Sequence, residues 1–490
     1  MTMARPAAGV EANPTPGVHL ALQYVSTRGL APKLGFEDVV VTGLARDGGL
    51  YVPERWHRLR KESVAAMGGM AFAEIATEII HPYTGGAVSR EALSQMARDA
   101  YATFGHKAVT PLVQIDRNRF VLELFHGPTL AFKDVAMQLL ARLMDHVLEK
   151  RGARATIVGA TSGDTGGAAI EAFRSSSRVD VVILYPHGRV SDVQRRMMTT
   201  PTEANVHAVA VDGTFDDCQA LVKGMFNDHA FRDRVALSGV NSINWARILA
   251  QVPYYFVAAT VLGSPYRPVA FSVPTGNFGD VFAGFVAKLM GLPVDRLIVA
   301  SNANDILPRA YATGTYDMRG VVATSSPSMD IQISSNFERL LFEMGGRDAA
   351  LIRAQMASLG QSGRFEIGGA LEPWREGFDA ASATEDEVAA AIRRVERESA
   401  YLMDPHTACA WVALEKRTVQ ADTPQVILST AHPAKFPDAM EAISGRRPSL
   451  PARLASLMSD PERSQRLPND LKAVESFVEG VSRAARGALS

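Results

Sequence analysis

Residues 120–134 read Phe-Val-Leu-Glu-Leu-Phe-His-Gly-Pro-Thr-Leu-Ala-Phe-Lys-Asp and predict a buried strand, a turn and the start of a helix. Residues 120–125 are apolar and rich in β-formers, and the Gly-Pro pair at 127–128 breaks the run. From residue 136 to residue 148, apolar side chains recur at steps of three and four, which predicts a helix with one apolar face and with Thr129 as its N-cap. This arrangement places Lys133 in the first turn of that helix.

Lys133 is the candidate catalytic residue of this stretch. The positive end of the helix dipole, the neighbouring Phe132 and the buried strand all disfavour the charged form of a lysine at this place. A neutral lysine amine is a nucleophile that can form a Schiff base with an aldehyde cofactor. The alternative is an exposed lysine on a solvated helix face, and the neighbouring motifs favour the first interpretation.

The composition is typical of a globular chain that can bury two or three cores. The 490 residues carry 51 basic and 52 acidic side chains, so a net charge of −1 favours neither nucleic acid nor an anionic membrane as a partner. No apolar stretch has the length of a membrane span, and residues 1–17, which lack a secretory signal region, are predicted to form a disordered lead. The two cysteines, Cys218 and Cys409, are too few for a disulfide framework, which favours a reducing, cytoplasmic location.

Strands that alternate with helices predict an α/β fold with parallel sheets. Short apolar strands occur at 155–159, 181–185 and 206–211, and a second strand-helix-strand unit spans 268–300. A helical pattern at 58–104 precedes them. We predict an N-terminal domain at 18–108, a large α/β domain formed by 109–128 and 237–450, a small α/β domain at 129–236 and a helical C-terminal segment at 451–490.

Two glycine-rich loops each connect a predicted strand to a helix. The loop at 160–167, Ala-Thr-Ser-Gly-Asp-Thr-Gly-Gly, presents amides and hydroxyls at the carboxyl edge of the sheet, where an anionic ligand is expected, although a glycine turn that serves packing alone is the alternative. The loop at 274–280, Pro-Thr-Gly-Asn-Phe-Gly-Asp, suits one phosphate group. It lacks the Walker lysine and the glycine spacing of dinucleotide sites, which disfavours a nucleotide.

Two further stretches are candidates for binding an anion. Ser26-Thr27-Arg28-Gly29 places two hydroxyls and a guanidinium side by side, a set that can hold a tetrahedral oxyanion, although an ordinary polar turn has the same composition. Asn244 and Arg247 lie one turn apart in a predicted long helix, which is compatible with a phosphate clamp or with a surface polar face. No metal is expected, because no histidine has metal-ligand spacing to other ligands; the lone histidines considered are His126, His406 and His432.

Four motifs together resemble the threonine synthase family, in its longer branch with an extra N-terminal domain. They are His-Gly-Pro-Thr-Leu-Ala-Phe-Lys-Asp at 126–134, Ser-Gly-Asp-Thr-Gly at 162–166, Gly-Asn-Phe-Gly at 276–279 and Ser-Thr-Ala-His-Pro-Ala-Lys-Phe at 429–436. The resemblance runs from residue 18 to residue 480. It implies the fold type II architecture of pyridoxal 5′-phosphate enzymes, similar to the tryptophan synthase β chain, with two doubly wound α/β domains and a small N-terminal domain. It also implies conversion of O-phosphohomoserine and water to threonine and phosphate.

The resemblance further implies roles for individual residues. Lys133 would form the Schiff base with the cofactor, and Thr430 would face its pyridine nitrogen. Asp164 stands beside the cofactor's phenolic oxygen, where many fold type II enzymes have Asn. The cofactor phosphate would be held by Gly276, Asn277, Phe278 and Gly279. The substrate carboxylate would be held by Ser162, Gly163 and Thr165. The substrate phosphate would be held by Ser26, Thr27 and Arg28, with Asn244 and Arg247.

The residue types agree with that chemistry. A hydroxyl opposite the pyridine nitrogen does not keep the ring fully protonated, which moderates electron withdrawal as replacement at a γ carbon requires. The freed Lys133 amine could carry protons at both carbon positions.

Two alternatives stay open. A serine or threonine dehydratase of the same fold eliminates at Cβ and needs no second anion site, and the stretch at 26–29 argues against it. A non-catalytic relative would bind cofactor or a protein partner, and the intact Lys133 and loops argue against it. The partner expected is the small-molecule substrate, with the protein as a monomer or homodimer.

Overall fold

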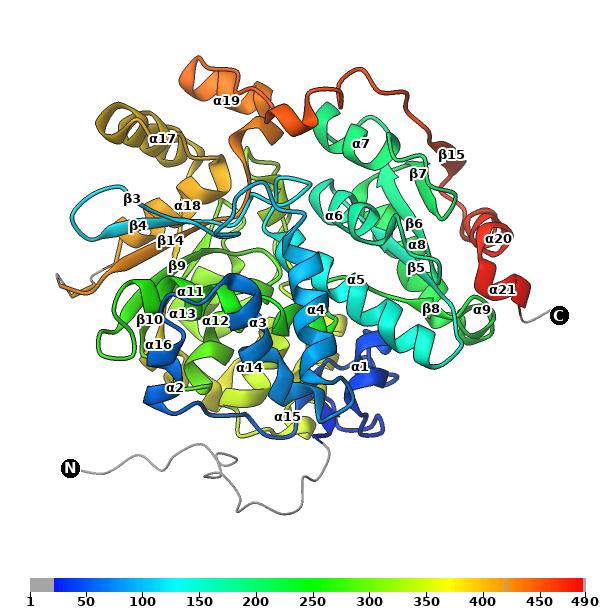
Figure 1. Cartoon of the computed structure of the whole chain (residues 1–490), viewed down its shortest axis with the longest axis horizontal. Helices are drawn as coiled ribbons and strands as arrows, with labels where there is room; N and C mark the ends of the chain where they lie inside the picture. Colours follow the sequence, from blue (N-terminus) through cyan, green and yellow to red (C-terminus); the bar gives the residue numbers. More distant parts are fainter. Residues whose placement is uncertain (1–21, 418, 421, 488–490) are drawn as a thin grey trace.

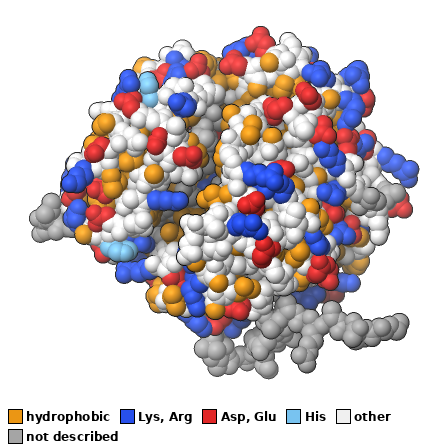
Figure 2. Space-filling model, turned by 180° about the vertical axis from the view of Figure 1, so that it is seen from behind, with side chains coloured by type: hydrophobic (Ala, Val, Ile, Leu, Met, Phe, Trp, Pro, Cys, Tyr) orange, Lys and Arg blue, Asp and Glu red, His pale blue; other side chains and the backbone are white. Residues whose placement is uncertain are grey.

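Two mainly parallel sheets, of six and five strands, lie side by side and are surrounded by helices (Figure 1). The computed structural model describes residues 22–417, 419–420 and 422–487, so the predicted lead at 1–17 lies outside the described residues. On the opposite face of the molecule the surface is hollowed between two halves (Figure 2). The predicted α/β class is therefore confirmed.

The six-stranded sheet has the order β13-β10-β9-β14-β4-β3, with only β3 antiparallel to its neighbour. Successive side chains of β10 point to opposite faces, so Leu297 packs in the core with α12 while Ile298 packs in the core with α18. Both faces are covered, which explains why these strands are continuous apolar runs. The bounds are β3 Leu112–Gln114, β4 Arg119–Glu123, β9 Val269–Pro274, β10 Val294–Ser301, β13 Phe378–Ser382, β14 Gln425–Ser429, α12 Gly279–Leu289 and α18 Pro405–Glu415.

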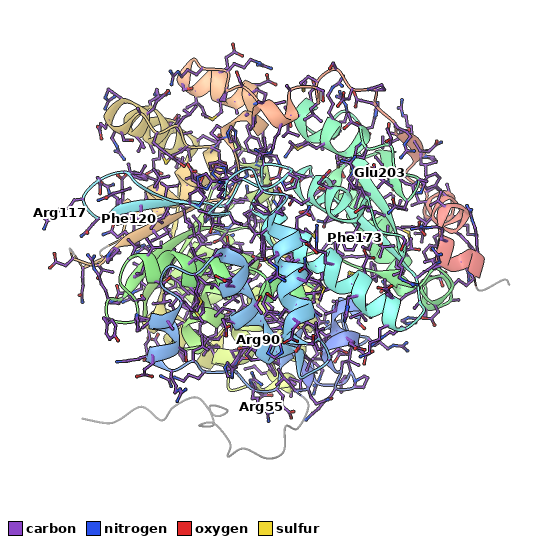
Figure 3. The ribbon with its side chains drawn as sticks, viewed as in Figure 1. Arg55, Arg90, Arg117, Phe120, Phe173 and Glu203 are labelled. Carbon is purple, nitrogen blue, oxygen red and sulfur yellow. The ribbon has the colours of Figure 1, made fainter. Side chains whose placement is uncertain are left out.

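The five-stranded sheet is parallel throughout, in the order β15-β7-β6-β5-β8. Ile157 packs in the core that contains α5 and α6, whereas Val158 packs with α8 and α20 on the other face. Phe173, the last residue of α6 (Figure 3), is fully buried in the core that contains α5 and α6. The bounds are β5 Ala155–Ala160, β6 Val179–Pro186, β7 Val206–Asp212, β8 Leu237–Ser238, β15 Gln465–Pro468, α5 Lys133–Lys150, α6 Asp164–Phe173, α8 Phe215–Asn227 and α20 Leu471–Val481.

The N-terminal part, from β1 to α4, packs through aromatic side chains on both halves of the molecule, the one with the six-stranded sheet and the one with the five-stranded sheet. The ring of Trp245 lies 6.1 Å from that of Tyr24 and 5.7 Å from that of Trp56. Helix α3 packs on α11, and α4 packs on α5, so one core continues through all three parts. The bounds are β1 Tyr24–Ser26, β2 Tyr51–Pro53, α1 Phe36–Thr42, α2 Lys61–Ala66, α3 Phe72–Ile80, η1 His81–Thr84, α4 Arg90–Tyr101 and α11 Val252–Val261.

Shorter elements connect these layers. The remaining α-helices are α7 Asp192–Thr199, α9 His229–Arg234, α10 Trp245–Leu249, α13 Ile306–Thr313, α14 Phe337–Met344, α15 Ala349–Ser362, α16 Leu371–Gly377, α17 Glu385–Ser399, α19 Pro437–Ser444 and α21 Arg483–Gly487. The 3₁₀ turns are η2 Pro327–Met329, η3 Gly368–Ala370, η4 Pro433–Lys435 and η5 Ala452–Leu454, and β11 Thr315–Asp317 pairs with β12 Arg364–Glu366. No helix within the described residues is both long and apolar enough to span a bilayer.

Three local expectations differ from the structure. The single long helix expected from residue 241 is two helices, α10 and α11, because Pro253 fits only the first turn of a new helix. The segment at 451–490 was predicted to be helical, but β15 extends the five-stranded sheet through a short, exposed and polar strand that has no apolar pattern. Strand β8 pairs with β5 although residues 237–238 were assigned to the large domain. The domain division itself stays a prediction.

Candidate active site

The candidate site forms where the carboxyl ends of strands from both sheets come together, the usual place for ligands in parallel α/β sheets. Thr430 follows β14, and the chain after β4 runs beside it, with Phe132 N donating to the Thr430 carbonyl at 2.8 Å. Lys133 then begins α5, as predicted. Asp164 begins α6 at the end of β5, and its Oδ2 lies 3.3 Å from Lys133 Nζ.

Lys133 and Asp164 form a buried ion pair to which a second lysine contributes. The Lys435 ammonium lies 2.7 Å from Asp164 Oδ1. Burial lowers the pKa of Lys133; the Asp164 carboxylate opposes this shift, whereas Lys435 and Arg247 reinforce it. Burial would raise the pKa of Asp164, but Lys435 and Lys133 outweigh it and hold that pKa well below its usual range. Asp164 is therefore ionised, and burial disfavours the charged form of Lys133.

The turn before Lys133 is fixed by Asp134 rather than by a cap on the helix. Thr129 was predicted to be the N-cap, but the N-cap is Phe132, so this prediction is wrong. The backbone N–H and the hydroxyl of Thr129 instead both donate to the Asp134 carboxylate at 2.7 Å. A Cβ on Gly127 would lie 2.3 Å from Asp134 Cβ, so only glycine fits there. These contacts fold residues 127–134 tightly and aim Lys133 at Asp164.

The loop at 160–167 is tied by a residue that sequence reasoning did not single out. The Thr161 hydroxyl accepts hydrogen bonds from Gly163 N and Gly166 N, both at 2.9 Å. The backbone N–H groups of Ser162, Asp164 and Thr165 donate to no described residue. Gly163 has φ +140°, and the Gln194 amide packs against it. The loop is thus closed by Thr161 and leaves donors for an anion.

The loop at 276–279 has the same character at the start of α12. Its carbonyl oxygens are used, since Gly276 O accepts from Ser334 Oγ at 2.6 Å and Asn277 O accepts from Asn336 N at 3.0 Å. Its four backbone N–H groups donate to no described residue. Phe278 is buried with φ 62°, a left-handed conformation that turns the chain into the helix. Unpaired N–H groups at a helix N-terminus suit a phosphate.

These residues fit pyridoxal 5′-phosphate. The buried amine of Lys133 suits its aldehyde, and the unpaired N–H groups at 276–279 suit its phosphate. Thr430 is buried, and within the described chain its hydroxyl has no hydrogen-bond partner, so it is free for a ring nitrogen. The chemistry of the donors therefore agrees with the cofactor at three separate points.

A serine on the far side of the site extends the network and was missed by sequence reasoning. Ser328 Oγ donates to Asp164 Oδ2 at 3.1 Å, and Ser328 N donates to His406 Nε2 at 3.3 Å. His406 Nδ1 lies 2.7 Å from Asp404 Oδ2, so the neutral ring donates through Nδ1 and accepts through Nε2. Asp164, Ser328 and His406 are far apart in sequence, and only the fold brings them together. Within the described part of the chain, no cluster of His, Cys, Asp or Glu suits a metal.

The stretch at 26–28 is held by two carboxylates. The Ser26 hydroxyl donates to Asp47 Oδ1 at 2.8 Å, and the Thr27 hydroxyl donates to Glu338 Oε1 at 2.6 Å. Arg28 forms two hydrogen bonds to Glu338, through Nε at 3.2 Å and Nη2 at 3.0 Å. A phosphate at this stretch would compete with Glu338 for the Thr27 hydroxyl and for Nε and Nη2 of Arg28. That Ser26, Thr27 and Arg28 bind the substrate phosphate stays a prediction.

Arg247 has different surroundings. It is buried, its Nη1 donates to the Val240 carbonyl at 2.9 Å, and its Nε has no hydrogen-bond partner within the described structure. It forms no ion pair with any carboxylate that the structure describes, and burial lowers its pKa to about 10. Asn244 caps α10 and donates to the Val40 carbonyl at 2.8 Å, so its side chain is already engaged. A buried cation without an anion marks Arg247 as an anion-binding candidate.

Three family models match successive parts of the chain. They are the threonine synthase N terminus at residues 23–101, the pyridoxal-phosphate dependent enzyme family at 103–431 and the threonine synthase C-terminal region at 407–478.

Individual relatives agree over nearly the whole chain. The threonine synthase of Pseudomonas aeruginosa is 50% identical over 461 residues, which cover 93% of this chain and 98% of that protein. The pyridoxal-phosphate-bound threonine synthase of Brucella melitensis is 58% identical, with a TM-score of 0.91 over 94% of this chain and 100% of that one. The yeast threonine synthase is 37% identical, with a TM-score of 0.88 over 94% of this chain and 99% of that one.

Proposed function

Because the chain belongs to the threonine synthase family, we propose that it converts O-phosphohomoserine and water to threonine and phosphate with pyridoxal 5′-phosphate. The observation that carries the proposal is the buried Lys133 amine, which faces Asp164 between two loops that each have backbone N–H groups without a partner among the described residues. One anion-binding loop suits the cofactor and the other suits the substrate carboxylate.

The cofactor, when bound, supplies an electron-accepting ring that stabilises negative charge on the substrate carbons. Lys133 would hold it covalently, residues 276–279 would hold its phosphate, and the Thr430 hydroxyl would face its ring nitrogen. Asp164 would face its phenolic oxygen. The hydroxyl of Thr430 cannot fix a positive charge on the ring nitrogen as a carboxylate would, which suits a reaction that must act at the γ carbon.

Lys133 is the residue that would move protons. Burial lowers the pKa of its amine, so a neutral amine can take a proton from the substrate Cα and, on the same flexible side chain, reach Cβ. The unpaired N–H groups of Ser162, Asp164 and Thr165 would hold the substrate carboxylate and keep those carbons within reach. Gly163, whose φ is +140°, allows the loop to present them.

We assign the substrate phosphate primarily to Arg247. Its guanidinium is buried without a carboxylate partner among the described residues, and its charge lowers the pKa of Lys133, so it acts electrostatically on the proposed reacting group. Arg28, by contrast, already has Glu338 as its counter-ion. A second anion site favours γ replacement over the dehydratase alternative, which needs none.

We further propose a cytoplasmic enzyme that acts on a small molecule as a monomer or homodimer, without nucleic-acid or membrane partners. Cys218 and Cys409 are buried and unpaired, as in proteins of a reducing compartment. Lys and Arg are interspersed with Asp and Glu on the face in Figure 2, a pattern that offers polyanions no continuous basic surface.

The test is phosphate release and threonine formation from O-phosphohomoserine by the purified chain with its cofactor. Lys133→Ala is expected to reduce both by at least about 1000-fold, since the nucleophile and base are lost together. Lys150→Ala is the matched control, because Lys150 is an exposed lysine at the other end of α5. Release of 2-oxo acids from serine or threonine without phosphate release would instead support the dehydratase. Equal turnover by Lys133→Ala would refute the assignment.

A further inference from the structure

Lys435 is a second buried lysine at the same carboxylate as Lys133. Its side chain is 1% exposed, and its Nζ lies 2.7 Å from Asp164 Oδ1. The same Nζ donates to the Thr129 carbonyl at 2.7 Å. It ends η4, whose N-terminus is capped by His432 through a hydrogen bond from Ala434 N. The chain after β14 therefore delivers a fixed cation to Asp164.

Both lysines form their ion pairs with the same carboxylate, while Asp134 interacts with Lys435 at longer range. Within the described chain, Asp164 is the only carboxylate in ion-pair contact with either lysine. It lies 2.7 Å from Lys435 and 3.3 Å from Lys133, so Lys435 is its closer counter-ion. Its Oδ1 also accepts from Gln194, and its Oδ2 accepts from Ser328. One carboxylate thus faces two cations, and the nearer cation is the one outside the proposed chemistry.

We propose that Lys435 is a positioning residue that takes Asp164 as its permanent counter-ion and so leaves the Lys133 amine free to give up its proton. This inference rests on the proposed function of Lys133. When Lys133 loses its proton to solvent, Asp164 keeps its charge, its partner and its place, because its ion pair with Lys435 does not involve Lys133. Without Lys435, Asp164 would have Lys133 as its sole counter-ion and would hold the proton on the amine that must react.

The groups that face Lys133 all bear on this inference. They are Asp164 on α6, Lys435 on η4 and Arg247 on α10. Burial lowers the pKa of Lys133, Asp164 raises it, and Lys435 and Arg247 lower it. Lys435 thus acts on Lys133 in two ways with the same sign, by direct repulsion and by neutralising Asp164. A neutral amide at position 435 could also donate the hydrogen bond to Thr129. That hydrogen bond therefore does not account for the positive charge of Lys435, whereas a role as counter-ion to Asp164 does.

The experiment replaces that charge in the full-length holoenzyme. Lys435→Gln keeps a donor for Thr129 and removes the charge, and Lys435→Met serves if the Gln variant does not fold. The first readout is the pH midpoint of the visible absorbance of the bound cofactor. The second is the pH midpoint of trace acetylation of Lys133 in the full chain after cofactor removal. Both midpoints are expected to rise by about one pH unit or more, as for an amine that acquires a sole carboxylate partner.

Two controls separate charge from structure. Lys435→Arg keeps the charge and is expected to leave both midpoints near those of the parent. Gln194→Met removes a neutral donor to the same oxygen atom and is expected to move them much less than Lys435→Gln. Unchanged midpoints in the Gln and Met variants, or an equal rise in the Arg variant, would overturn the inference. A parent protein without any cofactor absorbance would instead refute the proposed function, so the two failures can be told apart.

Discussion

Arg28 and Arg247 are both candidates for the substrate phosphate, and what each contacts decides between them. Arg28 is bidentate to Glu338, whose side chain is 7% exposed, whereas Arg247 has an unpartnered, buried Nε. A dianion arriving at Arg28 must displace a carboxylate, and one arriving at Arg247 completes an unfinished site. The net gain on binding is therefore larger at Arg247.

Arg247→Met is expected to lower kcat/KM for O-phosphohomoserine by about 30- to 1000-fold, the loss of a shielded charged contact of about 2 to 4 kcal/mol. Arg28→Met is expected to act mainly on stability, because it leaves Glu338 without its cation. Steady-state kinetics and thermal unfolding of both variants check this. A large loss of kcat/KM in Arg28→Met with little loss in Arg247→Met would return the substrate phosphate to residues 26–28.

The stability of the protein is expected to depend on pH through Asp280, which directly follows the loop at 276–279. Its Oδ1 accepts from Tyr255 at 2.9 Å and from Tyr254, while its buried Oδ2 has no described partner. Burial raises its pKa to about 6. A carboxyl with a raised folded-state pKa gives stability that is fully present below its unfolded pKa of about 4 and is lost as pH rises through about 6.

Asp280→Asn removes that titration, so its stability relative to the parent is expected to rise between about pH 4.5 and about pH 8, by roughly 2 kcal/mol. Chemical unfolding of both proteins at the two pH values measures the difference. Parallel pH profiles for the two proteins would mean that the pKa of Asp280 is not raised in the folded state.

At this scale the sequence predicts chemistry that is local and misses contacts that the fold creates. Lys133 and both loops could be found because each motif joins a strand end to a helix start. The Asp164–Lys435 pair could not, since nothing in either segment indicates the other. The Arg28–Glu338 pair joins residues 310 positions apart, so the sequence could not show that a carboxylate already occupies two donors of this predicted anion site.

Among the elements, buried parallel strands were predictable because their apolar runs reflect packing on both faces. Strand β15 was not, because it lies at the edge of its sheet and is largely exposed, so it carries no such pattern. One buried carboxylate adds to the strand pairing and the apolar contacts that hold this C-terminal segment. Asp180 on β6, with a 1% exposed side chain, accepts from Arg483 N and Nε, each at 2.6 Å.

Arg483→Met is expected to destabilise the protein by about 1 to 3 kcal/mol, because Asp180 keeps its burial and loses its cation; the partial exposure of Arg483 keeps the loss below that of a fully buried pair. Arg486→Met is the matched control, since Arg486 lies three residues on and is exposed. Limited proteolysis before α20 should release the C-terminal segment only in the Arg483 variant. Equal thermal midpoints for both variants would contradict this role of Asp180.

For the whole molecule, the site is the place where the two sheets are joined. Asp164 and Gln194 come from the five-stranded half, while Ser328 and Lys435 come from segments packed on the six-stranded half. Thr430 and residues 276–279 also belong to the six-stranded half. A cofactor held by Lys133, Asp164 and these residues would therefore link both halves.

This placement predicts that cofactor removal weakens the whole fold and not the site alone. A ligand present at about 1000 times its Kd stabilises the folded state by about 4 kcal/mol, so the thermal midpoint of the full chain is expected to fall when the cofactor is removed and to recover when it is restored. Inorganic phosphate, which lacks the ring and the aldehyde that would link the two halves, is expected to restore little.

Hydrogen exchange locates the effect: protection should fall both at 160–167 and at 276–280 on removal, because one ligand serves loops on two sheets. The Lys133→Ala variant keeps both loops but cannot form the covalent link to the cofactor. Its thermal midpoint is therefore expected to recover only in part when the cofactor is added. An unchanged midpoint after complete removal would show that the protein contacts through Asp164 are sufficient to hold the halves together. Loss of protection in one loop alone would show that the ligand is bound by a single half.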